Sequence, residues 1–244
     1  MSENFAFIPA RAGSKGVINK NLRNIGRFNL LELSILSALQ SEIFTKIYVS
    51  SNGHEILDCA KNIAKNANAS NIVQCVVRPD YLSEDRSTTE SAMEHLLGQI
   101  ECSDFDRFYI LQPTSVFRHQ DLIYNFYENF EESGCHSGFT ANAVTPFLWH
   151  RGNPQYDILK RKMRQDLSND ELFYHEDGNI FAFQHYVFKS LNNRLDTNPF
   201  IYETNEIQSL QIDTEFDLDY CSYICEKDVG VAEWTSSLAY LLQR

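Results

Sequence analysis

Short apolar runs alternate with amphipathic segments along the first half of the chain. Four runs have the length and composition of buried strands, at residues 5–8, 46–50, 72–77 and 107–111. Apolar residues recur at helical spacing over residues 30–40, 54–66, 88–100 and 120–132. Because strands that alternate with helices form βαβ units, this pattern predicts an α/β domain whose mostly parallel sheet is flanked by helices.

The second half of the chain is less regular. Strands are predicted at residues 138–143, 179–183 and 207–212, and helices at 185–191 and 215–226. Residues 144–172 combine Pro146, Trp149 and Pro154 with a basic cluster at 160–164. A stretch this irregular favours a projecting or partner-contacting element over a central part of the sheet. We therefore expect residues 1–143 and 173–244 to form the α/β domain, with residues 144–172 as an insertion.

The net charge of the chain argues against some classes of binding partner. The chain has 244 residues, with 21 Lys and Arg against 33 Asp and Glu, which gives a formal net charge of −12. Affinity for nucleic acid depends mainly on Lys and Arg contacts with phosphate, so this balance argues against a nucleic-acid-binding protein. It does not exclude a small anionic ligand. A chain of this length is expected to form one sizeable core without a disulfide or structural metal.

Cysteine spacing and the N-terminal residues indicate where in the cell the protein is located. The six cysteines include no C-x-x-C pair, so neither a zinc site nor a disulfide framework is expected. The first residues lack a basic segment, their apolar run ends at Pro9, and no run approaches membrane-spanning length. We therefore expect a cytoplasmic protein with reduced thiols and no membrane partner.

The loop after the first strand is the most informative segment. Small residues such as Gly13 and Ser14 let backbone N–H groups approach a phosphate, while Arg11, Lys15 and Lys20 add three cations. The loop has neither the P-loop spacing nor a G-x-G-x-x-G pattern. It is consistent with an anion site of another kind, and equally with a glycine-rich turn whose cations are solvated.

Seven short motifs follow one another along nearly the whole chain. They are IPARAGSKG with KNL at 8–16 and 20–22, VSS at 49–51, RP with STT at 78–79 and 87–89, LQPTS at 111–115, RQD at 164–166, EDGNIF at 176–181 and IDT at 212–214. In these motifs and their order the sequence resembles the CMP-sialic acid synthetases, or N-acylneuraminate cytidylyltransferases. That family has relatives that act on other 2-keto sugar acids, including legionaminic and pseudaminic acid.

The resemblance implies a Rossmann-like nucleotidyltransferase fold and a reaction. The anomeric hydroxyl of a 2-keto-3-deoxy sugar acid would attack the α-phosphate of CTP, giving the CMP-sugar and pyrophosphate, with Mg²⁺ or alternatively Mn²⁺. Such a reaction depends mostly on positioning and charge neutralisation, which suits a loop rich in N–H donors and cations. By resemblance, the phosphates would contact Arg11, Ser14, Lys15 and Lys20, and the nucleoside would contact Ala10, Asn21, Arg78, Ser87 and Thr89.

The acceptor side is implied by three further residues. Gln112 ends a predicted central strand, where open α/β sheets place ligands, and its counterpart in the family faces the sugar acid. Arg164 and Gln165 match the family's substrate-side arginine motif. Each residue also has a plain structural interpretation, since Gln-Pro often ends a strand and a charge run is usually solvated. With Arg11, Lys15 and Lys20, the residues Gln112 and Arg164 form the predicted catalytic set.

Asp213 is the candidate metal ligand, because it follows a predicted strand and would stand at the sheet's C-terminal rim. The alternative is that Asp213 or Thr214 caps the last helix. The sequence departs from the family at Gln211, where a second aspartate is common, and at Asn52, where an aspartate is usual. A neutral amide is a poorer ligand for a hard cation than a carboxylate, so Gln211 puts the number of protein ligands in doubt.

The resemblance also implies a homodimer, in which the insertion at 144–172 crosses to the partner and completes its active site. Two rival functions remain open. The chain could transfer CMP to another acceptor, such as an octulosonic acid or a phosphonate. It could also be a catalytically silent CTP-binding homologue, which the amide at Gln211 motivates. The purpose expected of the enzyme is to supply a glycosyl donor for surface glycans.

Overall fold

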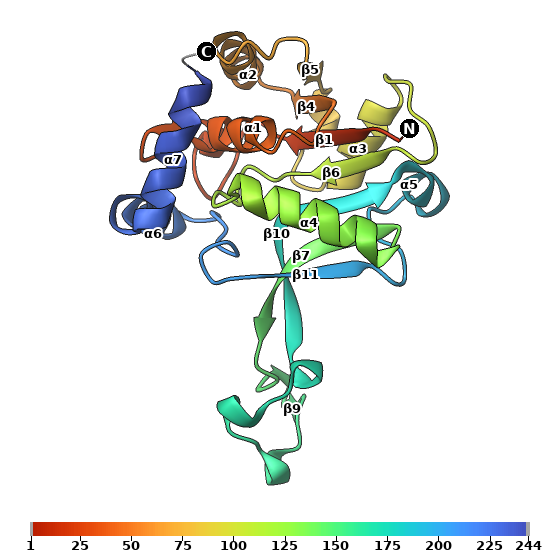
Figure 1. The fold of residues 1–244 in the computed structure, drawn as a ribbon, viewed down its shortest axis with the longest axis vertical. Helices are drawn as coiled ribbons and strands as arrows, with labels where there is room; N and C mark the ends of the chain where they lie inside the picture. Colours follow the sequence, from red (N-terminus) through yellow and green to blue (C-terminus); the bar gives the residue numbers. More distant parts are fainter. Residues whose placement is uncertain (1, 243–244) are drawn as a thin grey trace.

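A seven-stranded sheet forms the body of the protein in a computed structural model, which describes residues 2–242 (Figure 1). Across the sheet the strand order is β11-β7-β10-β6-β1-β4-β5. The strands are β1 Asn4–Pro9, β4 Lys46–Ser51, β5 Val73–Val77, β6 Arg107–Ile110, β7 Ser137–Val144, β10 Phe173–Gln184 and β11 Phe200–Thr204. Four neighbouring pairs are parallel and only β10 runs antiparallel to its neighbours, β6 and β7. The predicted α/β class with a mostly parallel sheet is confirmed.

Helices cover both faces of the sheet. They are α1 Leu30–Gln40, α2 His54–Asn66, α3 Thr89–Leu97, α4 Gln120–Ser133, α5 His185–Leu191, α6 Glu215–Lys227 and α7 Val229–Leu241. The alternation of β1 shows why two cores form, since successive side chains of a strand point to opposite faces. Ala6 and Ile8 pack into a core with α1, α2, α4 and α7. Phe5 and Phe7 pack on the other face with α3 and α5.

Local signals fix where several helices begin. Asn29 caps α1, accepting a hydrogen bond from Glu32 N while the Glu32 carboxylate accepts one from Asn29 N, both at 2.9 Å. Thr214 and Asp217 form the same reciprocal arrangement at the start of α6. The expected helix cap near Asp213 is therefore confirmed, and Thr214 supplies it. No described helix combines the length and apolar character that crossing a membrane requires.

Three sequence predictions about the C-terminal half are wrong or incomplete. Residues 207–212 are not a strand, because Gln208 and Asn205 bond to each other's backbone N–H groups and close a turn. The edge strand is instead β11, at residues that read as a polar loop. A further helix, α7, follows α6 and packs against α1 and α6.

The segment between β7 and β10 projects from the body as an arm (Figure 1). β7 and β10 pair from Phe173↔Val144 inward, with a register shift between Glu176 and Phe181. Beyond them the arm holds a two-strand hairpin and three 3-10 turns: β8 Trp149–His150, β9 Asn153–Pro154, Ile158–Lys160, Arg164–Asp166 and Asn169–Glu171. Several of its apolar side chains are exposed, and Leu159 reaches 91% exposure.

Candidate active site

A cavity of about 480 Å³ lies where the parallel strands end. Its walls include Pro9 at the end of β1, Arg78 just after β5 and Gln112 just after β6. Ligands of open α/β sheets bind beyond the carboxyl ends of the strands, so the topology marks this edge as the place for a site. The strands themselves supply rigid support for the loops that carry the polar groups.

Ten of the residues singled out from the sequence line this one cavity. They are Arg11, Ser14, Lys15, Lys20, Asn21, Arg78, Ser87, Thr89, Gln112 and Asp213. Ala10 is fully buried behind the loop and donates its backbone N–H to Ser50 O at 2.9 Å, so its side chain does not line the cavity. Asp213 reaches the rim through the turn that replaces the expected strand.

The glycine-rich loop is held in place by contacts with distant segments. The buried Asn21 donates from Nδ2 to Arg11 O at 2.9 Å, and Asn52 Oδ1 accepts from Ala12 N at 2.9 Å. Lys20 Nζ donates to Ile212 O at 2.7 Å and pairs with Asp213 Oδ1 at 3.0 Å. These contacts tie the loop to the segment before α6 and pair Lys20 with Asp213 in the lining of the cavity.

Asp85 is a cavity residue that the sequence analysis missed. Its carboxylate forms an ion pair with Lys15 and accepts a hydrogen bond from Arg11 Nη1 at 3.3 Å. The hydrogen bond from Lys15 and its charge, with those of Arg11, lower the pKa of the Asp85 carboxyl. Asp85 therefore stays ionised at neutral pH and occupies the two cations that an anionic ligand would use. Its surroundings, a polar loop, gave no signal of this role.

Arg78 is the most buried cation of the cavity, with 5% of its surface exposed. Its Nε has no hydrogen-bond partner among the described residues. Burial, and the charge of Arg11, lower the pKa of the Arg78 guanidinium to about 10, so it remains protonated at neutral pH. A buried charge without a counter-charge is costly, which makes Arg78 a strong attractor for an anionic or electron-rich ligand.

Gln112 is positioned by Arg118, a fully buried arginine that the sequence analysis did not identify. Arg118 Nη2 donates to Gln112 O at 2.9 Å and to Asn179 O at 2.7 Å, while Nε donates to Asn179 Oδ1 at 2.6 Å. Burial lowers the pKa of Arg118 to about 9 against the opposing attraction of Asp177. The arginine thus joins the end of β6 to the middle of β10.

Arg164 and Gln165 lie elsewhere. Both are exposed in a 3-10 turn of the arm, and neither lines the cavity of its own chain. Gln165 Nε2 contacts Met163 S at 3.4 Å within the arm. The structure therefore brings the loop residues together and leaves these two on the arm.

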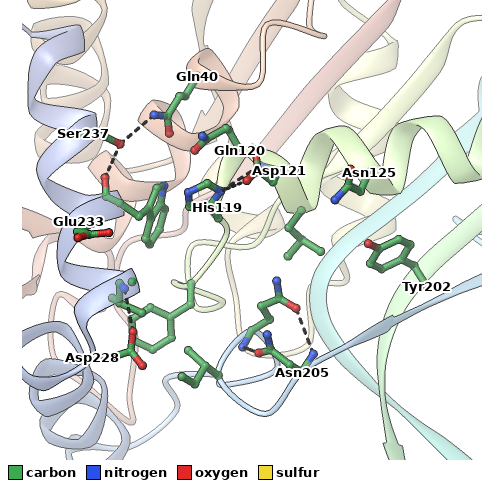
Figure 2. A pocket seen from close by; sticks show the side chains of 17 residues that line it. Gln40, His119, Gln120, Asp121, Asn125, Tyr202, Asn205, Asp228, Glu233 and Ser237 are labelled. Carbon is green, nitrogen blue, oxygen red and sulfur yellow. Dashed lines mark hydrogen bonds and ion pairs between the residues drawn. The ribbon is translucent and has the colours of Figure 1, made fainter.

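A larger cavity, of about 630 Å³, lies between α4 and α7 (Figure 2). Figure 2 shows carboxylates around it at Asp121, Asp228 and Glu233, and no Lys or Arg is among its lining residues in the described chain. The smaller cavity has four cations against two carboxylates, Asp85 and Asp213. Charge therefore favours the smaller cavity as the candidate site for an anionic ligand.

The carboxylates that line the cavity are the candidate ligands for a metal ion. Nowhere in residues 2–242 do three or more His, Cys, Asp or Glu side chains gather as a metal site. Asp213 is nonetheless exposed at the cavity mouth, with Lys20 as its partner. This donor set fits a Mg²⁺ ion that is held by one or two carboxylates and by substrate phosphates, and it does not fit an all-protein cage.

Comparison with known proteins identifies the family. The family model described as Cytidylyltransferase matches residues 5–234. The chain belongs to the cytidylyltransferase family. CMP-N,N'-diacetyllegionaminic acid synthase of Legionella pneumophila is 31% identical over 229 residues, covering 87% of this chain and 91% of that protein. N-acylneuraminate cytidylyltransferase of Escherichia coli O18:K1:H7 is 26% identical over 230 residues, covering 91% of this chain.

The family includes longer members. The chain spans 52% of the Escherichia coli protein. It spans 39% of a Helicobacter pylori protein named pseudaminic acid cytidylyltransferase and UDP-2,4-diacetamido-2,4,6-trideoxy-beta-L-altropyranose hydrolase, with which it is 26% identical over 211 residues, or 83% of this chain. The chain therefore covers about half of the length of one relative and less than half of the other.

Solved structures of other cytidylyltransferases share the fold. CMP:2-keto-3-deoxy-manno-octonic acid synthetase complexed with CTP superposes with a TM-score of 0.63 at 12% identity, over 93% of this chain and 100% of that one. 4-Diphosphocytidyl-2C-methyl-D-erythritol synthase from Anaerococcus prevotii gives 0.64 at 14% identity, over 93% and 99%. These matches confirm the Rossmann-like fold implied by the sequence motifs.

Proposed function

We propose that the protein transfers CMP from CTP to a nonulosonic acid such as sialic, legionaminic or pseudaminic acid. The observation that carries the proposal is the cavity in which Arg11, Lys15, Lys20 and Arg78 converge at the carboxyl edge of the sheet, in a chain of the cytidylyltransferase family. Arg11, Lys15 and Lys20 suit a triphosphate and the pyrophosphate that leaves it, and Arg78 suits the electron-rich nucleoside. The names of the relatives supply the class of acceptor.

The proposed reaction is a substitution at the α-phosphorus. The anomeric hydroxyl oxygen of the sugar acid forms a bond to the α-phosphorus, and the bond from that phosphorus to the bridging α–β oxygen breaks. Pyrophosphate leaves with the bond's electron pair, and the hydroxyl proton passes to solvent. Arg11, Lys15 and Lys20, with Ser14, bind the phosphates and neutralise the leaving group. The nucleoside contacts Asn21, Arg78, Ser87 and Thr89.

The acceptor side of the proposal needs a second copy of the chain. Gln112 lines the cavity, whereas Arg164 and Gln165 lie on the exposed arm. Exposed apolar side chains on the arm, including Trp149, Leu159 and Met163, support its burial against a partner. We therefore propose a homodimer in which the arm of one protomer brings Arg164 toward the sugar carboxylate bound by the other.

We propose Mg²⁺, with Mn²⁺ as a substitute, as the cofactor, held by Asp213 and the substrate phosphates. Bound there, the ion would neutralise phosphate charge. Lys20, which pairs with Asp213 and lines the same cavity, would contribute a second positive charge to the phosphates. A cytoplasmic location is proposed as well, supported by six free cysteines, which suit a reducing compartment.

A panel of acceptors tests the function. The full chain is incubated with CTP, Mg²⁺ and N-acetylneuraminic, legionaminic, pseudaminic or octulosonic acid, or a phosphonate, and pyrophosphate release is measured together with the CMP-sugar by mass spectrometry. We expect turnover with a nonulosonic acid and loss of turnover with EDTA. Turnover with only the octulosonic acid or the phosphonate would overturn the acceptor class. Calorimetric CTP binding without turnover by any acceptor would overturn the enzymatic function.

Two alanine variants test the loop. Arg11→Ala is expected to abolish CTP binding in calorimetry while the far-ultraviolet circular dichroism is unchanged. Arg23→Ala is the matched control, because Arg23 forms an ion pair with Glu215 at 2.8 Å and does not line the cavity. Unchanged CTP affinity in Arg11→Ala would reject the assignment of the phosphate site.

A further inference from the structure

Gln211, one of the two residues that depart from the family pattern, is attached to the loop that carries Gln112. It forms an isolated antiparallel bridge with Ser115. The next residue, Ile212, donates its N–H to Thr114 O at 3.0 Å. These backbone contacts hold Gln211 beside the loop that follows β6, next to Gln112, which lines the cavity.

The Gln211 carboxamide serves as a hydrogen-bond donor. Its Nε2 donates to the backbone carbonyl of Asp177, which also accepts from Ser115 Oγ at 3.2 Å. Asp177 is itself immobilised, because its buried carboxylate accepts hydrogen bonds from Thr140 Oγ1 and Thr204 Oγ1, each at 2.6 Å. An aspartate at position 211 would have no N–H to donate and would place a negative charge near this carbonyl oxygen.

Gly178 brings Gln211 and Gln112 together. It has a φ of +66°, and the position that a Cβ atom would take lies 2.8 Å from Gln112 Oε1 and overlaps Gln211 Nε2. The two carboxamides therefore approach one point above a residue that has no side chain. Among the described residues, no hydrogen bond involves the Gln112 carboxamide or Gln211 Oε1. The pair thus keeps donors and acceptors free for a ligand.

We propose that Gln211 and Gln112 form a carboxamide pair that binds a hydroxyl or acylamino group of the sugar acid, so that Gln211 determines acceptor specificity and does not ligate the metal. The inference rests on the proposed function, since it names a subsite for the same acceptor. Carboxamides donate and accept together, as hydroxyl and acylamino groups do. Asp213, two residues further along, is left as the carboxylate for the metal.

The test compares variants that differ in one property of the side chain. Gln211→Glu keeps the length and removes the N–H donors, Gln211→Asn keeps the amide and shortens it, and Gln211→Asp restores the carboxylate common in the family. Gln74→Glu is the matched control, because Gln74 also donates to a backbone carbonyl, Ser70 O at 3.3 Å, and lies on β5 away from the cavity lining. The acceptor is the sugar acid with the fastest turnover in the panel above.

We expect all three Gln211 variants to raise the KM for the sugar acid about fivefold, from one lost hydrogen bond. The affinity for CTP alone and the Mg²⁺ concentration at half-maximal rate should match those of the control. A Gln211→Asp variant that needs less Mg²⁺ with an unchanged KM for the acceptor would overturn the proposal, as would variants that leave every parameter unchanged. If the unmodified protein did not bind CTP, the proposed function itself would be refuted.

Discussion

Gly178 offers a sharp test because another glycine shares its backbone conformation. Gly178→Ala places a methyl group at a φ of +66°, where an L-residue costs about 1–2 kcal/mol, and against the ends of Gln112 and Gln211. Gly134, at the end of α4, has the same φ of +66° with no atom within 4 Å of the corresponding Cβ. Both variants should therefore lose about 1–2 kcal/mol of unfolding free energy, measured by urea denaturation.

Only Gly178→Ala should change catalysis. The side chains that the methyl group meets are flexible, so they rotate away and two hydrogen bonds to the acceptor are lost. At about 1 kcal/mol each, the KM for the sugar acid rises roughly 30-fold. The dissociation constant for CTP, measured by calorimetry, should stay unchanged in both variants. Equal acceptor kinetics in Gly178→Ala and Gly134→Ala would refute the convergence of the carboxamides over Gly178.

Three further outcomes are expected. Arg78→Met weakens CTP binding roughly 10-fold to 100-fold in calorimetry, because a hydrogen-bonding charge is removed, while exposed Arg86→Met does not. Asp85→Asn tightens CTP binding by up to about fivefold, because Arg11 and Lys15 are released. Its carboxyl pKa is lowered, so this gain is the same at about pH 6 and about pH 8.5 and disappears only in acid, where the wild-type carboxylate is protonated. Thr214→Ala removes the α6 cap and lowers the unfolding free energy by about 1 kcal/mol in urea denaturation.

Elements defined by local chemistry were predictable from the sequence. The helices at 30–40 and 54–66 have the predicted bounds, because their apolar spacing lies within the segments and the residues before them, Asn29 and Gly53, are adjacent in sequence. Strand β11 was missed because its place is set by pairing with β7, which begins at a residue far away in the sequence. Apolar residues at 207–212 suggested a strand, but hydrogen bonds between Asn205 and Gln208 close a turn there.

The residues of the candidate site also divide into those that could be identified from the sequence and those that could not. Arg11, Lys15 and Lys20 were identifiable because they cluster in one loop after one strand. Asp85 lies 74 residues from its partner Arg11, and Arg118 lies 61 residues from its partner Asn179. Neither side chain has a neighbour in the sequence that reveals its role. Their positions follow from the order of strands in the sheet, which composition and periodicity do not specify.

The register shift in β10 limits how far a change in strand pairing can spread along the strand. A strand that slips by one residue turns every side chain to the opposite face of its sheet. Between Glu176 and Phe181 the pairing of β10 with β7 shifts, so the outer and inner parts of the strand hold separate registers. A slip confined to the outer part of the strand would therefore leave Phe181 and Phe183 facing the core. The pairing at the base of the arm is thus set separately from the pairing inside the body of the sheet.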